Sequence, residues 1–281
     1  MDGAGTLFLV ATPIGNLGDL TERAVETLRS CDRVLAEDTR RTRRLLTHLA
    51  ITGKRIERLD AHAGPRELAR VLDALAAGER VAMVSDAGTP VVSDPGEALV
   101  EAAIRAGAHV VPIPGPSAVL AALVASGLAG GGARFRFLGF LPRDGAARRR
   151  AVSLACDTPE SVVFFEAPSR VQSTLRDLAD ATPERRACVA RELTKVHEEF
   201  VRGTLRELAG DARSWVGEIA IVLAPHDPEQ RGVDVDDAAI DARIDEALAS
   251  GEHLRTLAER LAAWTGRSRR ELYGRILGRK K

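Results

Sequence analysis

With 281 residues, of which 45% are hydrophobic, the chain is longer than an average single domain and is predicted to form two globular units. Its forty basic residues balance forty acidic ones, which argues against a protein that coats nucleic acid over its whole surface, and its three widely spaced cysteines form neither a disulfide framework nor a zinc pattern. The N-terminus lacks a signal-peptide pattern and no apolar run reaches the ~20 residues of a membrane span, so we expect a cytoplasmic protein that is not bound to a membrane.

The first half of the chain alternates short apolar runs with longer helical patterns. Five strands are predicted, at residues 7–11, 34–36, 55–59, 81–84 and 110–113. Helical patterns fill the intervals, and one helix is expected to begin with Asp94 as its N-cap, followed by Pro95 and by Glu97 at the third position. This alternation is typical of an α/β unit with a mostly parallel sheet and helices on both faces, which we assign to residues 1–127.

The second half is predicted to hold a different α/β unit, over residues 134–225, after a link rich in glycine and alanine. Its strands are expected at residues 135–141, 162–165, 187–190, 199–202 and 219–223. Some of these strands are joined tightly enough to be antiparallel, so we expect a mixed sheet. An acidic stretch rich in proline and glycine, residues 226–237, then leads to a small helical extension over residues 237–281.

Carboxylates follow several of the predicted strands. They are Glu37, Asp38, Asp86, Glu166 and Glu192. Open α/β sheets bind ligands outside the carboxyl ends of their strands, so these side chains are candidates for ligand contact. The alternative for each one is that it caps the helix that follows.

Three loops beside these carboxylates are rich in glycine and proline, namely residues 12–19, 85–90 and 112–118. Glycine lets the backbone approach a ligand closely, and proline fixes the shape of a loop. Three such loops at one sheet edge predict a rigid cleft that suits a small cofactor with adenine, ribose and carboxylate groups. The motifs of dinucleotide-binding proteins, P-loop proteins and α/β-hydrolases are absent, and His62 near Asp60 makes no metal cluster.

Five motifs in the chain carry a resemblance to a known family. They are residues 12–19 (TPIGNLGD), 36–40 (AEDTR), 84–90 (VSDAGTP), 114–118 (PGPSA) and 190–195 (ARELTK). In this order they resemble the RsmI family, the bacterial small-subunit rRNA (cytidine-2′-O)-methyltransferases within the tetrapyrrole-methylase superfamily. The resemblance covers essentially the whole chain. It implies a two-domain tetrapyrrole-methylase-like fold, with S-adenosyl-L-methionine in the cleft between the domains and no metal.

The resemblance also implies the substrate and the residues that contact the cofactor. The expected substrate is a decoding-region cytidine of small-subunit rRNA within the assembled 30S subunit, and the expected state is a homodimer. The residues expected to contact the cofactor are Pro13, Asp86, Ala87, Gly88, Thr89, Ser117, Ala118, Phe165 and Glu166.

The chemistry of methyl transfer to a ribose hydroxyl calls for a group that accepts the hydroxyl proton. The candidate catalytic residues are Asp38, Asp86, Glu192 and Lys195, with Lys195 stabilising a developing alkoxide. The residues expected to handle the acceptor are Glu37, Arg40, His62 and Arg191. His62, itself a further candidate base, lies where the family has a His-x-His-Asn-Glu stretch, and here only the second histidine of that stretch is kept.

Two other functions stay open at this point, a tetrapyrrole methyltransferase of the same superfamily and a non-catalytic RNA-binding protein. The helical extension bears on the second, because residues 267–281 hold seven basic residues and one acidic residue. Apolar residues recur there at helical spacing, and Ser268 with Glu271 forms a capping box after Gly266. We predict an RNA-binding helical pair, the alternative being a pair that packs on the rest of the protein.

Overall fold

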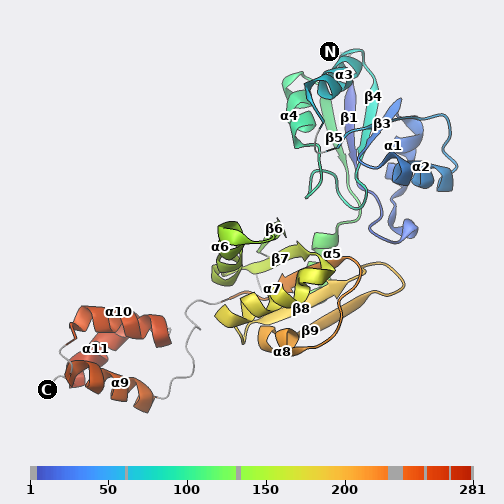
Figure 1. The fold of residues 1–281 in the computed structure, drawn as a ribbon. Coiled ribbons are helices and arrows are strands. Elements are labelled where there is room, and N and C mark those ends of the chain that lie inside the picture. Colours follow the sequence, from blue (N-terminus) through green and yellow to red (C-terminus); the bar gives the residue numbers. More distant parts are fainter. Residues whose placement is uncertain are drawn as a thin grey trace.

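The computed structural model describes residues 5–60, 63–130, 134–226, 237–249, 252–265 and 267–279. In these ranges the chain forms two α/β units, each built on a five-stranded sheet, and a group of three helices (Figure 1). The predicted fold class is confirmed. Within the described ranges, no helix is long and apolar enough to cross a membrane.

The first sheet is wholly parallel, with strand order β3-β2-β4-β1-β5. Its strands are β1 (Thr6–Val10), β2 (Arg33–Ala36), β3 (Arg55–Arg58), β4 (Arg80–Val84) and β5 (His109–Ile113). The central strand β4 is buried on both faces, since Ala82 and Val84 pack on one side while Val81 and Met83 pack on the other. This double burial explains the unbroken apolar run in the sequence.

Helices cover both faces of this sheet. They are α1 (Glu22–Ser30), α2 (Thr39–His48), α3 (Pro65–Ala76) and α4 (Glu97–Arg105), with a short 3₁₀ helix η1 (Leu17–Asp19) after β1. Leu28 of α1 and Leu46 of α2 join the apolar cluster on one face. Leu75 of α3 and Leu99 of α4 join the cluster on the other face.

The predicted N-cap Asp94 is wrong, because α4 begins later. Its N-cap is Gly96, with φ of 127° and no side-chain cap. This φ favours glycine, and a Cβ atom at this position would also lie 2.5 Å from Met83 Cε. The helix therefore begins after Gly96, and Asp94 belongs to the loop between β4 and α4.

The second sheet is mixed, with strand order β6-β7-β10-β8-β9. Its strands are β6 (Phe135–Phe140), β7 (Ser161–Glu166), β8 (Arg186–Arg191), β9 (Glu199–Thr204) and β10 (Ile219–Leu223). Only β6 and β7 pair in parallel, and the remaining neighbours are antiparallel.

Four helices pack on the second sheet. They are α5 (Ala118–Ser126), α6 (Gly145–Asp157), α7 (Pro168–Ala181) and α8 (Leu205–Gly210). Residues of α6, α7 and α8 share one apolar cluster with Phe164 and Ile221. On the opposite face, Val119 and Leu123 of α5 pack with Val163 and other strand residues. Helix α5 thus lies in the range 1–127 that we assigned to the first unit, yet it packs on strands of the second.

The three C-terminal helices, α9 (Asp237–Ala249), α10 (Leu254–Thr265) and α11 (Arg269–Arg279), bury their own apolar cluster. Ile244, Leu261 and Ile276 are buried in it, one from each helix. The Ser268 hydroxyl accepts a hydrogen bond from the Glu271 N–H at 3.2 Å, which is one of the two hydrogen bonds of the predicted capping box. The predicted linker, residues 226–237, and Gly266 lie for the most part outside the described residues.

Candidate functional site

The loops that follow β1, β4 and β5 are tied together at the carboxyl edge of the first sheet. Thr12 and Gly88 exchange two backbone hydrogen bonds, each 2.9 Å long. The Thr12 hydroxyl donates to the Ser85 carbonyl at 3.0 Å, and the Thr89 hydroxyl donates to the Pro116 carbonyl at 3.2 Å. The prediction that these three loops meet at one edge is therefore confirmed.

A cavity of about 350 Å³ opens beside these loops and reaches the second sheet. Eight of the nine residues predicted to contact a cofactor line it: Asp86, Ala87, Gly88, Thr89, Ser117, Ala118, Phe165 and Glu166. The ninth, Pro13, lines a neighbouring cavity instead. Apolar side chains of both α/β units, including Ile14, Val119 and Leu193, complete the walls.

Sequence reasoning missed several residues of this cavity. They are Ile14, Val92, Ser93, Asp94, Val119, Phe140, Ala167, Pro168, Leu193, Gly217, Glu218, Ile219 and Ala220. The segment 217–220 enters β10, which runs antiparallel to β7 and β8, so the amino end of β10 reaches the edge where β7 and β8 end. A search restricted to residues that follow strands cannot find this segment, because it precedes β10. Phe140 does lie at the end of a strand, β6, but its apolar side chain is not among the polar groups that mark the other strand ends.

Backbone strain is concentrated around this cavity. Among the described residues, five non-glycine residues have positive φ, and four of them lie in two loops beside the cavity. They are Val91 (72°), Ser93 (62°), Glu192 (52°) and Thr194 (65°). Each such conformation costs about 1–3 kcal/mol and persists only where the surroundings enforce it, typically at functional sites.

The loop that carries Glu192 and Thr194 also joins the two α/β units. The Asn16 N–H, in the loop after β1, donates to the Thr194 hydroxyl at 3.1 Å. The Thr194 N–H in turn donates to Glu198 Oε2 at 2.6 Å. A Cβ atom on Gly15 would lie 2.5 Å from Lys195 Cγ, so glycine is required where the loops cross. The motifs 12–19 and 190–195 thus meet in space.

Two of the predicted catalytic residues are partners of each other. Glu192 Oε1 accepts hydrogen bonds from Lys195 Nζ at 2.7 Å and from the Glu218 N–H at 2.9 Å. The hydrogen bond from Lys195 is the main reason that the pKa of Glu192 lies below its usual value. Lys195 also contacts Glu218 at 3.0 Å. Neither Glu192 nor Lys195 lines the cavity, although Leu193 and Glu218 do.

Glu166 is a fully buried wall residue whose oxygens already have partners. It accepts hydrogen bonds from Thr174 Oγ1 at 2.7 Å and from the Ala167 N–H at 2.8 Å, and it pairs with Arg170 at 2.5 Å. A buried carboxylate with this set of partners fixes the end of β7 and the start of α7.

A second cavity, of about 240 Å³, also has Asp86 in its wall. The loops after β1 and β4 contribute Thr12, Pro13, Leu17, Ser85 and Asp86, and helix α2 contributes Arg41, Thr42, Arg44, Leu45 and His48. Asp86 is the residue that lines both this cavity and the larger one. Its Oδ1 accepts the Asp38 N–H at 3.0 Å, and its Oδ2 lies 4.0 Å from Arg41 Nε.

The other predicted residues that the structure describes line neither cavity. Asp38 caps α2 and binds the Arg40 guanidinium, and these hydrogen bonds lower the pKa of Asp38 to about 2. Burial, and then the nearby charges of Asp86 and Asp94, raises the pKa of Glu37. Arg191 pairs with Glu199 at 2.9 Å, and His62 lies outside the described residues.

Metal ions need groups of ligand side chains. In the described ranges, no group of three or more histidine, cysteine or acidic side chains is arranged to hold an ion. The three cysteines are buried, and no disulfide joins them.

Comparison with known proteins yields one family and many relatives. The family model for tetrapyrrole (corrin/porphyrin) methylases matches residues 6–209. The ribosomal RNA small subunit methyltransferase I of Xylella fastidiosa is 44% identical over 282 residues, which cover 98% of this chain and 100% of that protein. The protein of the same name from Thermotoga maritima is 45% identical over 222 residues, which cover 78% of this chain and 98% of that protein.

Solved structures share the fold at low sequence identity. A diphthine synthase has a TM-score of 0.61 at 17% identity, covering 78% of this chain and 90% of that one. The uroporphyrin-III-C-methyltransferase of Thermus thermophilus has a TM-score of 0.57 at 21% identity, covering 79% of this chain and 94% of that one. At these identities the likeness extends to the fold alone.

Proposed function

Since the chain belongs to the RsmI branch of the tetrapyrrole (corrin/porphyrin) methylase family, we propose that it methylates small-subunit rRNA, using S-adenosylmethionine to modify the 2′-hydroxyl of a cytidine in the decoding region. The observation that carries the proposal is the place of Asp86, which lines both the large cavity and the cavity beside it. A carboxylate shared by two cavities is suited to chemistry between two bound molecules.

The large cavity fits S-adenosylmethionine. Its volume of about 350 Å³ falls in the range of small-molecule sites, roughly 300–1,000 Å³. Its walls combine apolar side chains with the Ser117 and Thr89 hydroxyls and with the backbone of Ala87 and Gly88. Gly88 has φ of 80° and carries no side chain to fill the space.

When bound, S-adenosylmethionine supplies a methyl group that is already activated, so the protein has mainly to align the acceptor oxygen and remove its proton. Asp86 is the base that we favour. The Asp38 N–H holds Oδ1 in place, while Oδ2 contacts, among the described residues, Arg41 alone, at 4.0 Å, and is the oxygen that we expect to accept the proton. Asp38 and Glu192 are bound to Arg40 and Lys195, which makes both weaker candidates.

The choice of acceptor rests on the relatives, whose names state action on small-subunit rRNA. An assembled 30S subunit in the cytoplasm is the substrate that we propose, because RNA is often recognised by its folded shape. We also propose a homodimer, since Leu120 and Val124 on the outer side of α5 are 50% and 74% exposed.

The proposal is tested by offering labelled S-adenosylmethionine to the purified protein with one acceptor at a time. Methyl transfer to 30S subunits that lack the modification, and none to a uroporphyrinogen, is the expected result. Transfer to the tetrapyrrole alone would assign the chain to the small-molecule branch of its family. Binding of subunits without binding of the cofactor would make it a non-catalytic RNA-binding protein.

A further inference from the structure

The 240 Å³ cavity beside helix α2 is lined by residues of a different kind from those of the 350 Å³ cavity, which we call the cofactor cavity. Three basic side chains, Arg41, Arg44 and His48, lie on one wall, and the apolar side chains Leu17 and Leu45 lie beside them. We propose that this cavity receives one unstacked nucleotide of single-stranded RNA, the nucleotide whose ribose is methylated. The inference rests on the proposed function and names the site that holds its acceptor.

Helix geometry explains how α2 supplies this wall. Arg41, Arg44, Leu45 and His48 stand at positions i, i+3, i+4 and i+7, and therefore share one face. Thr42 and Leu46 are the buried residues of the helix, and Leu46 belongs to the core of the first unit. The helix is thus anchored by its core contacts, while its basic face borders the cavity.

Arg44 is free to bind a ligand. The neighbouring Arg40 is bound to Asp38, and Arg41 lies near Asp86. In the described part of the chain, Arg44 has no acidic partner, although it lines a cavity. A free guanidinium offers paired N–H donors that match a phosphate group, and its flat face can stack on a base.

The position of Asp86 fixes which part of the nucleotide lies where. Asp86 stands at the wall shared with the cofactor cavity, so the ribose hydroxyl has to lie against it. The arginine face of α2 then meets the adjoining phosphate, and Leu17, Leu45 and His48 are left to contact the base. RNA is commonly read in this way, with an unpaired base taken out of its stack and held by side chains.

The test compares Arg44→Ala with Arg43→Ala, an exposed arginine one position earlier that lines neither cavity. Binding to 30S subunits is measured over a range of salt concentrations, and S-adenosylmethionine affinity is measured by calorimetry. Arg44→Ala is expected to weaken subunit binding about ten-fold and to flatten the salt slope by about 0.7, the value for one phosphate contact of a single strand. Arg43→Ala is expected to match the wild type, and both variants should keep cofactor affinity.

A second variant tests the cavity without removing a positive charge. Leu17 is 47% exposed, so Leu17→Glu leaves the core intact and introduces a carboxylate that repels phosphate. It should also weaken subunit binding. If Arg44→Ala and Leu17→Glu bind subunits as tightly as the wild type, or if Arg43→Ala loses as much as Arg44→Ala, the inference is overturned. A wild type that methylates no subunits would instead defeat the proposed function.

Discussion

Among single residues, Asp86 is the one on which the proposed reaction depends. The Asp86→Asn protein keeps the size and shape of the side chain but cannot accept a proton. Loss of a general base lowers a rate roughly 10²–10⁴-fold, so single-turnover methyl transfer to 30S subunits should fall by that factor while cofactor affinity stays within a few-fold.

The matched control is Asp38→Asn. Asparagine caps a helix as well as aspartate does, so α2 should remain intact, and Asp38 lines neither cavity. We expect a much smaller loss of rate. Equal losses in the two variants, or a nearly normal rate for Asp86→Asn, would show that the base is another residue.

Gly88 offers a second residue-scale prediction, with Gly107 as its control. Their φ angles are 80° and 78°, so alanine at either position strains the backbone by about 1–2 kcal/mol. Only at Gly88 does the new Cβ atom meet the cofactor cavity, 3.3 Å from Ile14 Cγ2, whereas nothing lies within 4 Å at Gly107. Denaturant unfolding should show similar destabilisation for both, and calorimetry should show weakened S-adenosylmethionine binding for Gly88→Ala alone. Unchanged binding by Gly88→Ala would remove this loop from the cofactor site.

At the scale of elements, the first sheet and the edge that bears the site could be predicted from the sequence. Parallel strands alternate with helices, and their carboxyl ends share one edge, so residues after β4 and β5 could be placed together from their order alone. The places of Asp94 and of the segment 217–220 in the cavity wall could not be predicted in this way. The first depends on how Gly96 packs against Met83, and the second on the antiparallel pairing of β10, which are both long-range contacts.

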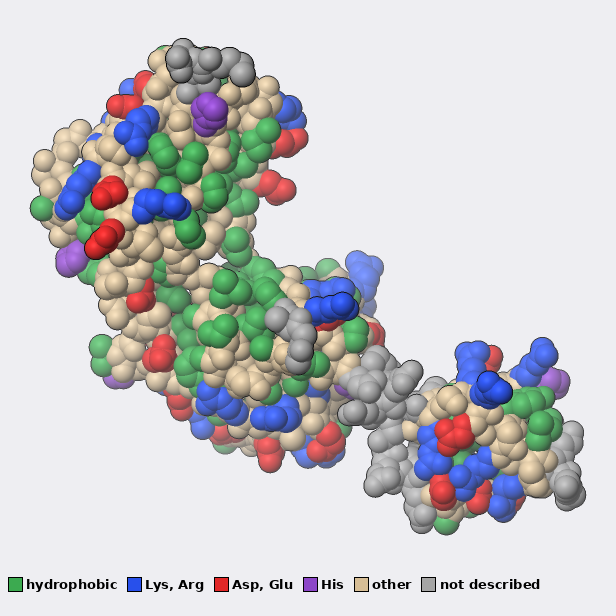
Figure 2. Space-filling model, turned by 180° about the vertical axis from the view of Figure 1, so that it is seen from behind, with side chains coloured by type: hydrophobic (Ala, Val, Ile, Leu, Met, Phe, Trp, Pro, Cys, Tyr) green, Lys and Arg blue, Asp and Glu red, His purple; other side chains and the backbone are tan. Residues whose placement is uncertain are grey.

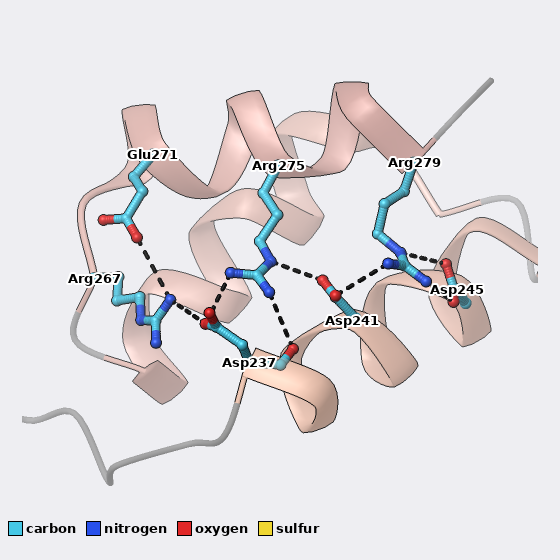
Figure 3. A network of polar contacts seen from close by, with 7 residues as sticks. All are labelled: Asp237, Asp241, Asp245, Arg267, Glu271, Arg275 and Arg279. Carbon is cyan, nitrogen blue, oxygen red and sulfur yellow. Dashed lines mark hydrogen bonds and ion pairs between the residues drawn. The ribbon is translucent and has the colours of Figure 1, made fainter.

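The ion pairs of the C-terminal helices also could not be predicted from the sequence. Arg267, Arg275 and Arg279 each bind an aspartate of α9, through Asp237, Asp241 and Asp245 (Figure 3). We call these six residues the arginine–aspartate ladder. The ladder neutralises much of the positive charge that the sequence of residues 267–281 suggests for RNA binding. The ladder instead ties α11 to α9. RNA binding by this extension stays a prediction, and it would have to use basic side chains outside the ladder.

The ladder makes the helical extension sensitive to acid. Hydrogen bonds from Arg267, Arg275 and Arg279 hold the pKa values of Asp237, Asp241 and Asp245 below the ordinary 3.8. A carboxyl whose pKa is lowered on folding stabilises the fold above the unfolded pKa, and this contribution is lost as the pH falls below it. Hydrogen exchange of the full-length protein should therefore show α9 and α11 opening more readily as the pH falls from about 5 to about 3.

Asp241→Asn tests the cause of this acid sensitivity. It removes the carboxylate that Arg275 and Arg279 share, so exchange should be faster at neutral pH and should change less with acid. Amide exchange itself depends on pH, so the exchange rates of α9 and α11 are compared with those of the helices of the first unit at each pH. A variant whose α9 and α11 respond to acid as the wild type does would show that the ladder does not hold the helices together.

At the scale of the whole molecule, exposed apolar surface predicts self-association. Figure 2 shows hydrophobic side chains gathered on one face of the second α/β unit, near the first. Helix α5 is apolar on all sides, and its Leu120 and Val124 remain exposed in the single chain. Sedimentation of the wild type should give a dimer, and the double variant Leu120→Asp with Val124→Asp should shift it to a monomer. A dimer unaffected by both changes would place the interface elsewhere.

The proposed reaction of this chain is methylation of a ribose hydroxyl on small-subunit rRNA. The most direct measurement is mapping of 2′-O-methylation, at nucleotide resolution, on 30S subunits incubated with the protein and S-adenosylmethionine. We predict one new 2′-O-methylcytidine in the decoding region, absent when the cofactor or the protein is left out. Methylation of a base instead of a ribose, or no new modified nucleotide in the small subunit, would contradict the account.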